Sequence, residues 1–430
     1  MNASLNKQPA QGASGPLFDA LEGRAPADRE TALMAALPQQ IAHARTRSRA
    51  FAKLLAGVDA LAVDSREALA QLPVIRKHEL LEQQKAAREA GGDIFGGFSA
   101  LAFGPRMPRV FASPGTIYEP EGGRKDYWRM ARAMYAAGFR SGELIHNCFS
   151  YHFVPAGSMM ETGAHALGCT VFPGGTGQTE QQVQTIVELK PAGYIGTPSF
   201  LKIILEKAQE MGVALPSLKK AMFGGEAFPP SLRDWFSARG VDGYQCYATA
   251  DLGLIAYETT AREGLVLDEN VLVEIVRPGT GEPVPEGEVG ELVVTTFNPD
   301  YPLIRFGTGD LSAMLPGPCP TGRTNHRIKG WMGRADQTTK IRGMFVHPGQ
   351  VADIARRFPD VIRARLVVSG EMASDRMTLQ VEVAGSRQGL AERIGEAIRD
   401  ITKLRGDVEV VAPGSLPNDG KVIEDARSYQ

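Results

Sequence analysis

The middle of the chain decides the fold, and residues 159–211 read MMETGAHALGCTVFPGGTGQTEQQVQTIVELKPAGYIGTPSFLKIILEKAQEM. Stretches with apolar residues at helical spacing alternate here with short apolar runs bounded by Gly and Pro. Helices are expected at 159–167, 180–189 and 200–211, and strands at 169–172, which reads as buried, and at 192–195. Helices and strands that alternate in this way indicate an α/β architecture with a largely parallel sheet.

The segments on either side of this stretch differ in texture. Residues 29–90 are rich in Ala, Leu, Gln, Glu and Arg and predict helix, whereas Gly and Pro become frequent after Gly91-Gly92. A further helix is expected at 126–137. Strands at 271–276 and 290–296, with a turn at 278–283 between them, predict an antiparallel β-layer.

The end of the chain predicts a separate small unit that begins near Gly333. Its expected elements are a helix at 348–358, strands at 361–368 and 377–383, a helix at 390–404 and a strand at 408–411. About ninety residues in this α-β-β-α-β order are enough for an independent α+β domain. The fold class is therefore α/β, with a large N-terminal domain of mainly parallel sheets plus a β-layer and a small C-terminal domain.

Composition excludes several classes of protein. The 430 residues carry 47 Lys and Arg against 49 Asp and Glu, and a net charge of −2 gives no footprint for nucleic acid. The four cysteines lack Cys-x-x-Cys spacing, which argues against a disulfide scaffold. The chain shows neither a signal peptide nor a run of about 18 apolar residues, so we expect a cytoplasmic protein without a membrane segment.

Four loops have the composition of ligand-binding turns. Ser113-Pro114-Gly115-Thr116 follows apolar residues, as a loop that wraps a phosphate would. Gly224-Gly225-Glu226 follows another apolar run, and Tyr247 stands four residues before Asp251. Asp310 lies on a Gly-rich turn suited to holding two ribose hydroxyls. Each loop alone is also compatible with an ordinary turn, a buried Tyr or a helix-capping Asp.

The order and spacing of these loops resemble the phenylacetate–CoA ligase family of adenylate-forming enzymes. The block Gly333-Arg334-Ala335-Asp336 to Arg342-Gly343, followed by Val346-His347-Pro348, resembles the hinge motif of that family. Arg305 to Asp310 resembles its R-x-x-T-G-D loop, and Gly420-Lys421 resembles its terminal Gly-Lys element. Further matches lie at 151–157, 173–180 and 196–199, so the resemblance covers 112–427.

The resemblance implies a two-step reaction and a set of partners. A small-molecule carboxylic acid, aryl or short, would react with Mg-ATP to give an acyl-adenylate, and coenzyme A would then displace AMP. The implied ligands are ATP, Mg²⁺ and coenzyme A, and the family also suggests a homodimer. The implied domains are 1–333 and 337–430, with a hinge at 334–336.

The family's functional residues can be carried over by position. Lys421 would bridge the acyl carboxylate and the α-phosphate, and Arg334 would contact the nucleotide beside the pivot Asp336. Ser113, Gly115 and Thr116 would bind phosphates, Gly225 and Glu226 would line the adenine site, and Tyr247 would stack on the base. Asp310 would hold the ribose, Asp251 would take the place of the family's Mg²⁺-binding Glu, and Gly343 would lie near the pantetheine. The expected acyl-pocket residues are Tyr151, His152, Phe153, Ala156 and Gly157.

Two departures from the family pattern bear on these expectations. The phosphate loop of the family reads like S-S-G-T-T-G-K-P, whereas this chain places Glu119 where the family has a Lys. An acid there should weaken the attraction for a triphosphate. The cysteines of a structural zinc site found in some relatives are missing apart from Cys319, so we expect no zinc.

Two other functions stay open at this point. An adenylating enzyme could pass its acyl group to a carrier protein or an amine instead of coenzyme A. A nucleotide- or CoA-binding homologue that no longer catalyses would also fit the altered phosphate loop. Lys421 near a chain end could be an ordinary solvated lysine, and His152 could be a core histidine.

Overall fold

A computed structural model describes residues 15–277, 280–332, 334–335, 339–346, 348–370, 375–385, 389–417 and 421–427. The chain forms two compact units, Met1–Met332 and Gly333–Gln430. The expected turn at 278–283 lies partly outside the described residues. Gly333, Asp336 and Gly420 lie outside them entirely. None of the described helices is both long and apolar enough to cross a bilayer.

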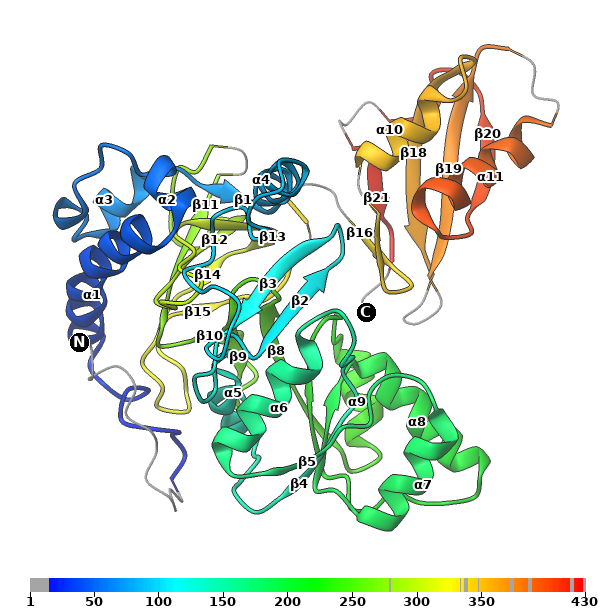
Figure 1. The fold of residues 1–430 in the computed structure, drawn as a ribbon. Coiled ribbons are helices and arrows are strands. Elements are labelled where there is room, and N and C mark those ends of the chain that lie inside the picture. Colours follow the sequence, from blue (N-terminus) through cyan, green and yellow to red (C-terminus); the bar gives the residue numbers. More distant parts are fainter. Residues whose placement is uncertain are drawn as a thin grey trace. The chain divides into compact units, whose positions relative to one another are not determined.

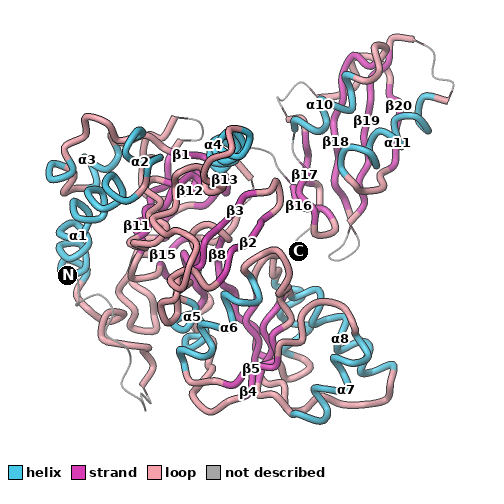
Figure 2. The backbone as a smooth tube through the Cα atoms, in the orientation of Figure 1, coloured by secondary structure: helices cyan, strands magenta, loops and turns pink. Residues whose placement is uncertain are grey.

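The α/β architecture is confirmed by a nine-stranded sheet in the first unit (Figures 1 and 2). Its strands, in order across the sheet, are β14 (Met314–Leu315), β15 (Arg327–Ile328), β10 (Leu265–Leu267), β9 (Gly253–Glu258), β8 (Asp242–Thr249), β7 (Lys220–Phe223), β6 (Gly193–Gly196), β4 (Leu144–Asn147) and β5 (Thr170–Phe172). The strands from β8 to β5 pair in parallel, and the others pair antiparallel.

One helix precedes β4, four others connect successive parallel strands, and together they cover both faces of that part of the sheet. They are α5 (Met130–Ala136), α6 (Ala156–Leu167), α7 (Thr179–Leu189), α8 (Pro198–Glu210) and α9 (Pro230–Ser237). Figure 1 shows α5 and α6 together on one side and α7 and α8 together on the other. This match with the sequence prediction has one exception. The segment 169–172 was expected to be buried, but β5 is an edge strand and its side chains are partly exposed, because a partner strand lies only on one side.

The expected antiparallel β-layer is also present, as three strands of a four-stranded sheet whose fourth strand, β1, pairs in parallel. Its order is β1 (Ile75–Arg76), β13 (Phe306–Ser312), β12 (Gly290–Thr296) and β11 (Val271–Val276). β11 and β12 have the predicted bounds and pair antiparallel, with Val271 opposite Thr296. Apolar side chains of this sheet and of the N-terminal helices form one continuous core.

The N-terminal segment was expected to be helical from 29 to 90, and the structure divides it into shorter helices. They are α1 (Pro26–Arg47), α2 (Arg49–Leu54), η1 (Ala60–Ala62), α3 (Arg66–Ala70) and α4 (Lys77–Glu89). Ser48 and Ser65 cap two of the new helices, because their hydroxyls accept hydrogen bonds from Phe51 N and Ala68 N. The helix-forming residues on either side of Ser48 and Ser65 therefore do not join into one helix. Each Ser side chain accepts a hydrogen bond from the first turn of the helix that follows it.

The second unit forms a four-stranded sheet with two helices. The sheet order is β20 (Asp407–Val411), β19 (Arg376–Val383), β18 (Val361–Ser369) and β21 (Ile423–Asp425). α10 (Pro348–Arg356) and α11 (Leu390–Thr402) pack on this sheet, and a hairpin of β16 (Thr339–Ile341) and β17 (Met344–Val346) precedes them. The second unit has its own apolar core, centred on residues such as Leu379 and Ile394, and is therefore a compact α+β unit.

Arg305 fastens the N-terminal segment to the β-layer. Its side chain is almost completely buried and makes two hydrogen bonds of 3.0 Å to the Glu274 carboxylate. It also donates to the backbone oxygens of Ala70, Leu72 and Gly281. Burial raises the pKa of Glu274, and the charge of Arg305 opposes that shift.

We therefore predict that Arg305→Met destabilises the protein by about 3–5 kcal/mol, because it leaves Glu274 buried without its cation. The double variant Arg305→Met/Glu274→Leu should recover part of this loss. Chemical denaturation of the three proteins measures both effects. A single variant as stable as the original chain would contradict the role of Arg305.

A second prediction concerns Asp126, whose partly buried carboxylate accepts hydrogen bonds from Met130 N at 2.8 Å and Ala131 N at 3.1 Å at the start of α5. Burial raises the pKa of Asp126 to about 6. The folded chain binds the proton of the Asp126 carboxyl group more tightly than the unfolded chain does. The contribution of this group to the free energy of unfolding is therefore lost as pH rises from about 4 to about 6.

Asp126→Asn cannot titrate, and its positive φ of 49° is one that Asn tolerates. The melting temperature of the variant relative to the original chain should therefore increase between pH 4 and pH 6.5. Parallel thermal melts at both pH values test this, and a constant difference would show that Asp126 does not titrate in this range.

Candidate functional site

The parallel strands β4, β6 and β7 end at one edge of the large sheet. From β4 the chain moves first to β5 on one side and then to β6 on the other side. In open α/β sheets, ligands bind outside the carboxyl ends of the strands at such a change of direction. The loops that follow β4, β6 and β7 therefore surround the candidate site.

The loop after β4 and the first turn of α6 contain all five expected acyl-pocket residues. Asn147 holds it by donating to the Tyr151 hydroxyl at 2.8 Å and to the Gly157 carbonyl at 3.0 Å. A Cβ atom on Gly157 would lie 2.7 Å from the Ser150 carbonyl oxygen, so glycine is required there. Tyr151 and Ala156 are partly buried and Gly157 is buried, whereas the side chains of His152 and Phe153 are exposed.

A hairpin packs its backbone against this loop. It consists of β2 (Arg109–Ser113) and β3 (Ile117–Glu121), and Ala112 N donates to the Phe153 carbonyl at 2.7 Å. Phe153 has a positive φ of 59°, which is strained for a bulky residue, and its side chain is 80% exposed. The expected phosphate-binding residues lie on this hairpin, with Ser113 buried and with Gly115 and Thr116 exposed at the tip.

The loops after β6 and β7 are joined by one hydrogen bond. Ser199 N, at the start of α8, donates to the Glu226 carboxylate at 3.3 Å. Gly225 and Glu226 are exposed, and Gly225 has a φ of +76°, which favours glycine. This places the expected adenine-site residues at the same edge as the loop after β4.

Asp310 joins the two sheets of the first unit at this site. From β13 it accepts a hydrogen bond of 2.7 Å from the Tyr247 hydroxyl, at the carboxyl end of β8. Its other oxygen accepts a bond of 3.1 Å from the Trp331 indole nitrogen. The residue expected to hold the ribose therefore lies in direct contact with the residue expected to stack on the base.

Asp251 is buried in the turn between β8 and β9 and pairs with Lys77 from the start of α4, at 2.7 Å. Its Oδ1 atom is buried and has no hydrogen-bond partner among the described residues. One carboxylate oxygen is a fitting protein ligand for Mg²⁺, which keeps water and substrate phosphates as its other ligands. Asp251 therefore fits the expected magnesium site, with a lysine beside it.

The remaining expected site residues belong to the second unit. Arg334 is partly buried, and Gly343 is exposed in the β16–β17 turn with a φ of +83°. Lys421 is exposed, and its backbone oxygen accepts a bond of 3.4 Å from Arg365. Asp336 lies outside the described residues.

The region where some relatives carry zinc is filled by hydrogen bonds and an ion pair. Cys319 Sγ is 3.5 Å from Thr259 Oγ1 and 3.1 Å from Thr321 Oγ1, and Arg323 pairs with Glu22 at 3.1 Å. Within the described part of the chain, no group of three or more His, Cys, Asp and Glu side chains is placed to hold a metal ion.

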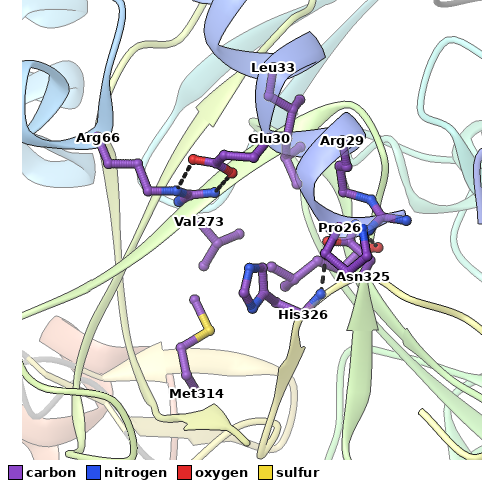
Figure 3. A pocket seen from close by; sticks show the side chains of 11 residues that line it. Pro26, Arg29, Glu30, Leu33, Arg66, Val273, Met314, Asn325 and His326 are labelled. Carbon is purple, nitrogen blue, oxygen red and sulfur yellow. Dashed lines mark hydrogen bonds and ion pairs between the residues drawn. The ribbon is translucent and has the colours of Figure 1, made fainter. Parts of the chain in front are cut away.

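A small cavity lies under α1, away from the site residues described above (Figure 3). It has a free volume of about 20 Å³, the space of a single water molecule. Glu30 and Arg66 form an ion pair at its wall, and burial with the nearby Arg66 lowers the pKa of His326, which faces it. A nucleotide or an acyl group needs far more room, so this cavity is not the candidate site.

Two residues of the site, Lys77 and Trp331, were not predicted from the sequence. Lys77 looked like one more residue of a long helix, and its partner Asp251 is 174 positions away. The sequence did carry one signal for Lys77. A cation in the first turn of a helix is unfavourable, so a lysine there suggests an acidic partner elsewhere in the chain. Trp331 lies three residues before the expected hinge at 334–336 and gave no signal of its own.

Comparisons with known proteins agree with this geometry. Residues 126–298 match the family model of AMP-binding enzymes. The phenylacetate-coenzyme A ligase of Thermus thermophilus is 32% identical over 421 residues, which cover 89% of this chain and 92% of that protein. The enzyme of the same name from Escherichia coli K12 is 30% identical over 74% of this chain and 78% of its own length.

A solved structure shows the same fold. The crystal structure of 2-hydroxyisobutyryl-CoA ligase, in complex with 2-HIB-AMP and CoA, matches with a TM-score of 0.82 and 23% sequence identity. The match covers 99% of this chain and 95% of that one. On its identity and coverage with the Thermus thermophilus and Escherichia coli proteins, the chain belongs to the phenylacetate–CoA ligase family.

Proposed function

We propose that this chain is an ATP-dependent carboxylic acid–CoA ligase that acts through an acyl-adenylate and uses an aryl acid such as phenylacetate, or a short acid. Family membership supports the reaction class. The observation that carries the proposal is the hydrogen bond from Tyr247 to Asp310. It joins two sheets at the edge where a base and a ribose would lie together.

The proposed chemistry has two steps. A carboxylate oxygen of the acid forms a bond to the α-phosphorus of ATP, and the bond to the bridging oxygen of pyrophosphate breaks. The sulfur of coenzyme A then bonds to the acyl carbon, its proton passes to solvent and AMP leaves. Adenylation is needed because a carboxylate has no leaving group of its own.

In the first unit, the roles of the residues follow their places at the strand edge. Asp310 would accept hydrogen bonds from the ribose, and Tyr247, with Gly225 and Glu226, would bind the base. The loop 151–157 would contact the acyl group. Asp251 would hold Mg²⁺, which neutralises phosphate charge when bound, while Lys77 balances the buried carboxylate.

In the second unit, we assign Lys421 to the charge that develops on the carboxylate and α-phosphate, because of its place in the family motif. Arg334 would contact the nucleotide, Asp336 would be the pivot of a hinge at 334–336, and Gly343 would lie on the pantetheine path. The domain bounds 1–333 and 337–430, a homodimer and a cytoplasmic location belong to the same proposal and rest on the resemblance.

A second candidate function is favoured by the altered phosphate loop. A carboxylate at position 119 suits a homologue that binds nucleotide or coenzyme A without catalysis. Transfer of the acyl group to a carrier protein or an amine is a further alternative. Release of pyrophosphate with Mg-ATP, coenzyme A and a panel of aryl, hydroxy and short-chain acids separates these functions from the ligase.

In that assay, Lys421→Ala should reduce acid-dependent pyrophosphate release about 100-fold or more, because it removes a cation that acts on charge in the transition state. Lys403→Ala is the matched control, since Lys403 is an exposed lysine of the same unit at the end of α11. Equal rates for the two variants would refute the role of Lys421. No release with any acid would favour the non-catalytic function.

Asp310→Ala should weaken AMP binding by about 10- to 100-fold, because it removes hydrogen bonds to a charged acceptor. Asp242→Ala is a matched control, because Asp242 also accepts a hydrogen bond from a tyrosine, at 2.7 Å from the Tyr244 hydroxyl. Asp242 lies at the start of β8, whereas Tyr247, the partner of Asp310, lies near the end of that strand. Calorimetric titration with AMP measures both. A similar loss in the two variants would mean that Asp310 acts only on stability.

A further inference from the structure

The phosphate loop of this chain is a tight hairpin turn. Ser113 pairs with Ile117 across β2 and β3, so that only Pro114, Gly115 and Thr116 form the turn. Thr116 N donates to the Ser113 carbonyl at 3.1 Å, and Gly115 and Thr116 have φ values of 98° and 62°. This geometry closes the loop onto itself through local hydrogen bonds.

The Glu119 side chain occupies donors that such a loop offers to a ligand. Its carboxyl group is completely buried and accepts a hydrogen bond of 3.2 Å from Ser113 N. A second, short hydrogen bond comes from the Ser113 hydroxyl to the other carboxyl oxygen. The backbone N–H and hydroxyl of Ser113 are the kind of donors that bind phosphate oxygens in loops of this composition.

The groups around Glu119 add to this effect. Burial and the charge of Asp251 raise the pKa of Glu119 to about 8, and Lys77 opposes that shift. Lys77 is the cation that faces both acids, but its ammonium lies 2.7 Å from Asp251. Burial, together with Asp251 and Glu119 nearby, raises the pKa of Tyr301, so its hydroxyl stays neutral beside these groups. A polyphosphate that enters here therefore meets two carboxyl groups and one lysine already paired with one of them.

We propose that Glu119 is a specificity-determining residue, whose carboxyl group holds the Ser113 donors and thereby disfavours nucleoside triphosphates relative to nucleoside monophosphates. ATP has to displace Glu119 from Ser113 before its β- and γ-phosphates can use these donors. AMP lacks these two phosphates and does not meet this competition. The inference rests on the proposed function in one respect, that the nucleotide binds at this edge of the sheet.

The proposal predicts that one variant changes the affinity for ATP but not the affinity for AMP. Glu119→Ala should tighten ATP binding by about tenfold or more, because it frees the backbone N–H and the hydroxyl of Ser113 for phosphate oxygens. AMP affinity should change by less than about twofold. Glu119→Gln keeps an acceptor oxygen for Ser113 on a side chain of similar size, so it should show a smaller gain for ATP, and it protects the test if the Ala variant does not fold.

The experiment is calorimetric titration of the full chain with ATP and with AMP, each with MgCl₂. Glu82→Gln is the matched control, because Glu82 is an exposed acid on α4, the helix whose Leu81 and Gln84 contact the hairpin. A selective gain for ATP in both Glu119 variants, absent in Glu82→Gln, supports the proposal. An unchanged ATP affinity, an equal gain for AMP, or no ATP binding in any variant overturns it.

This readout is independent of catalysis. If pyrophosphate release is absent with every acid but the ATP-to-AMP affinity ratio rises in the Glu119 variants, the ligase function fails and the specificity role of Glu119 stands. If release is present and the ratio does not change, the ligase function stands and the role of Glu119 fails.

Discussion

Parallel pairing of β4, β6, β7 and β8 is the constraint on which the candidate site depends. Parallel strands point the same way, so the segments that follow them emerge at one edge, however far apart they are in the sequence. The loop after β4, the Gly-rich turn after β7 and Tyr247 at the end of β8 meet for this reason. The second sheet adds Asp310, which accepts a hydrogen bond from the Tyr247 hydroxyl.

Charge balance at this edge comes from a distant part of the chain. The N-terminal helices pack on the antiparallel sheet, and this packing places the start of α4 beside the β8–β9 turn. A buried carboxylate without a cation is expensive, and Lys77 reduces that cost for Asp251. The helical N-terminal segment therefore does more than cover a sheet, because it supplies a charge to the site.

Much of the fold could be predicted because its signals are local. Gly and Pro separate the strands and helices between 159 and 211, and a high content of Val, Ile and Thr marks β11 and β12 with correct bounds. The division of the N-terminal helices depended on capping by Ser48 and Ser65, which a compositional reading overlooks. The partial exposure of β5 depended on which strand lies at the sheet edge, which is a property of the whole topology.

The candidate site was predictable only through its ordered motifs. Ser113, Tyr247, Asp251 and Asp310 were each weak signals, and their resemblance to a family pattern identified them. Lys77 and Trp331 have no motif, and their roles follow from contacts across 174 and 21 positions of sequence. The residues from Ser113 to Thr116 were compatible both with an ordinary turn and with a phosphate-binding loop. The structure shows a tight turn in which the Glu119 carboxyl group accepts hydrogen bonds from the backbone N–H and hydroxyl of Ser113.

The two aromatic donors on Asp310 have a consequence for the thermodynamics of recognition. Its carboxylate oxygens already accept hydrogen bonds from a phenol and an indole. Each carboxylate oxygen has a second lone pair, so a sugar hydroxyl could donate to Asp310 without displacing the phenol or the indole. In the proposed function, a carboxylate held in one orientation before the ligand arrives would lose little side-chain entropy on binding the sugar.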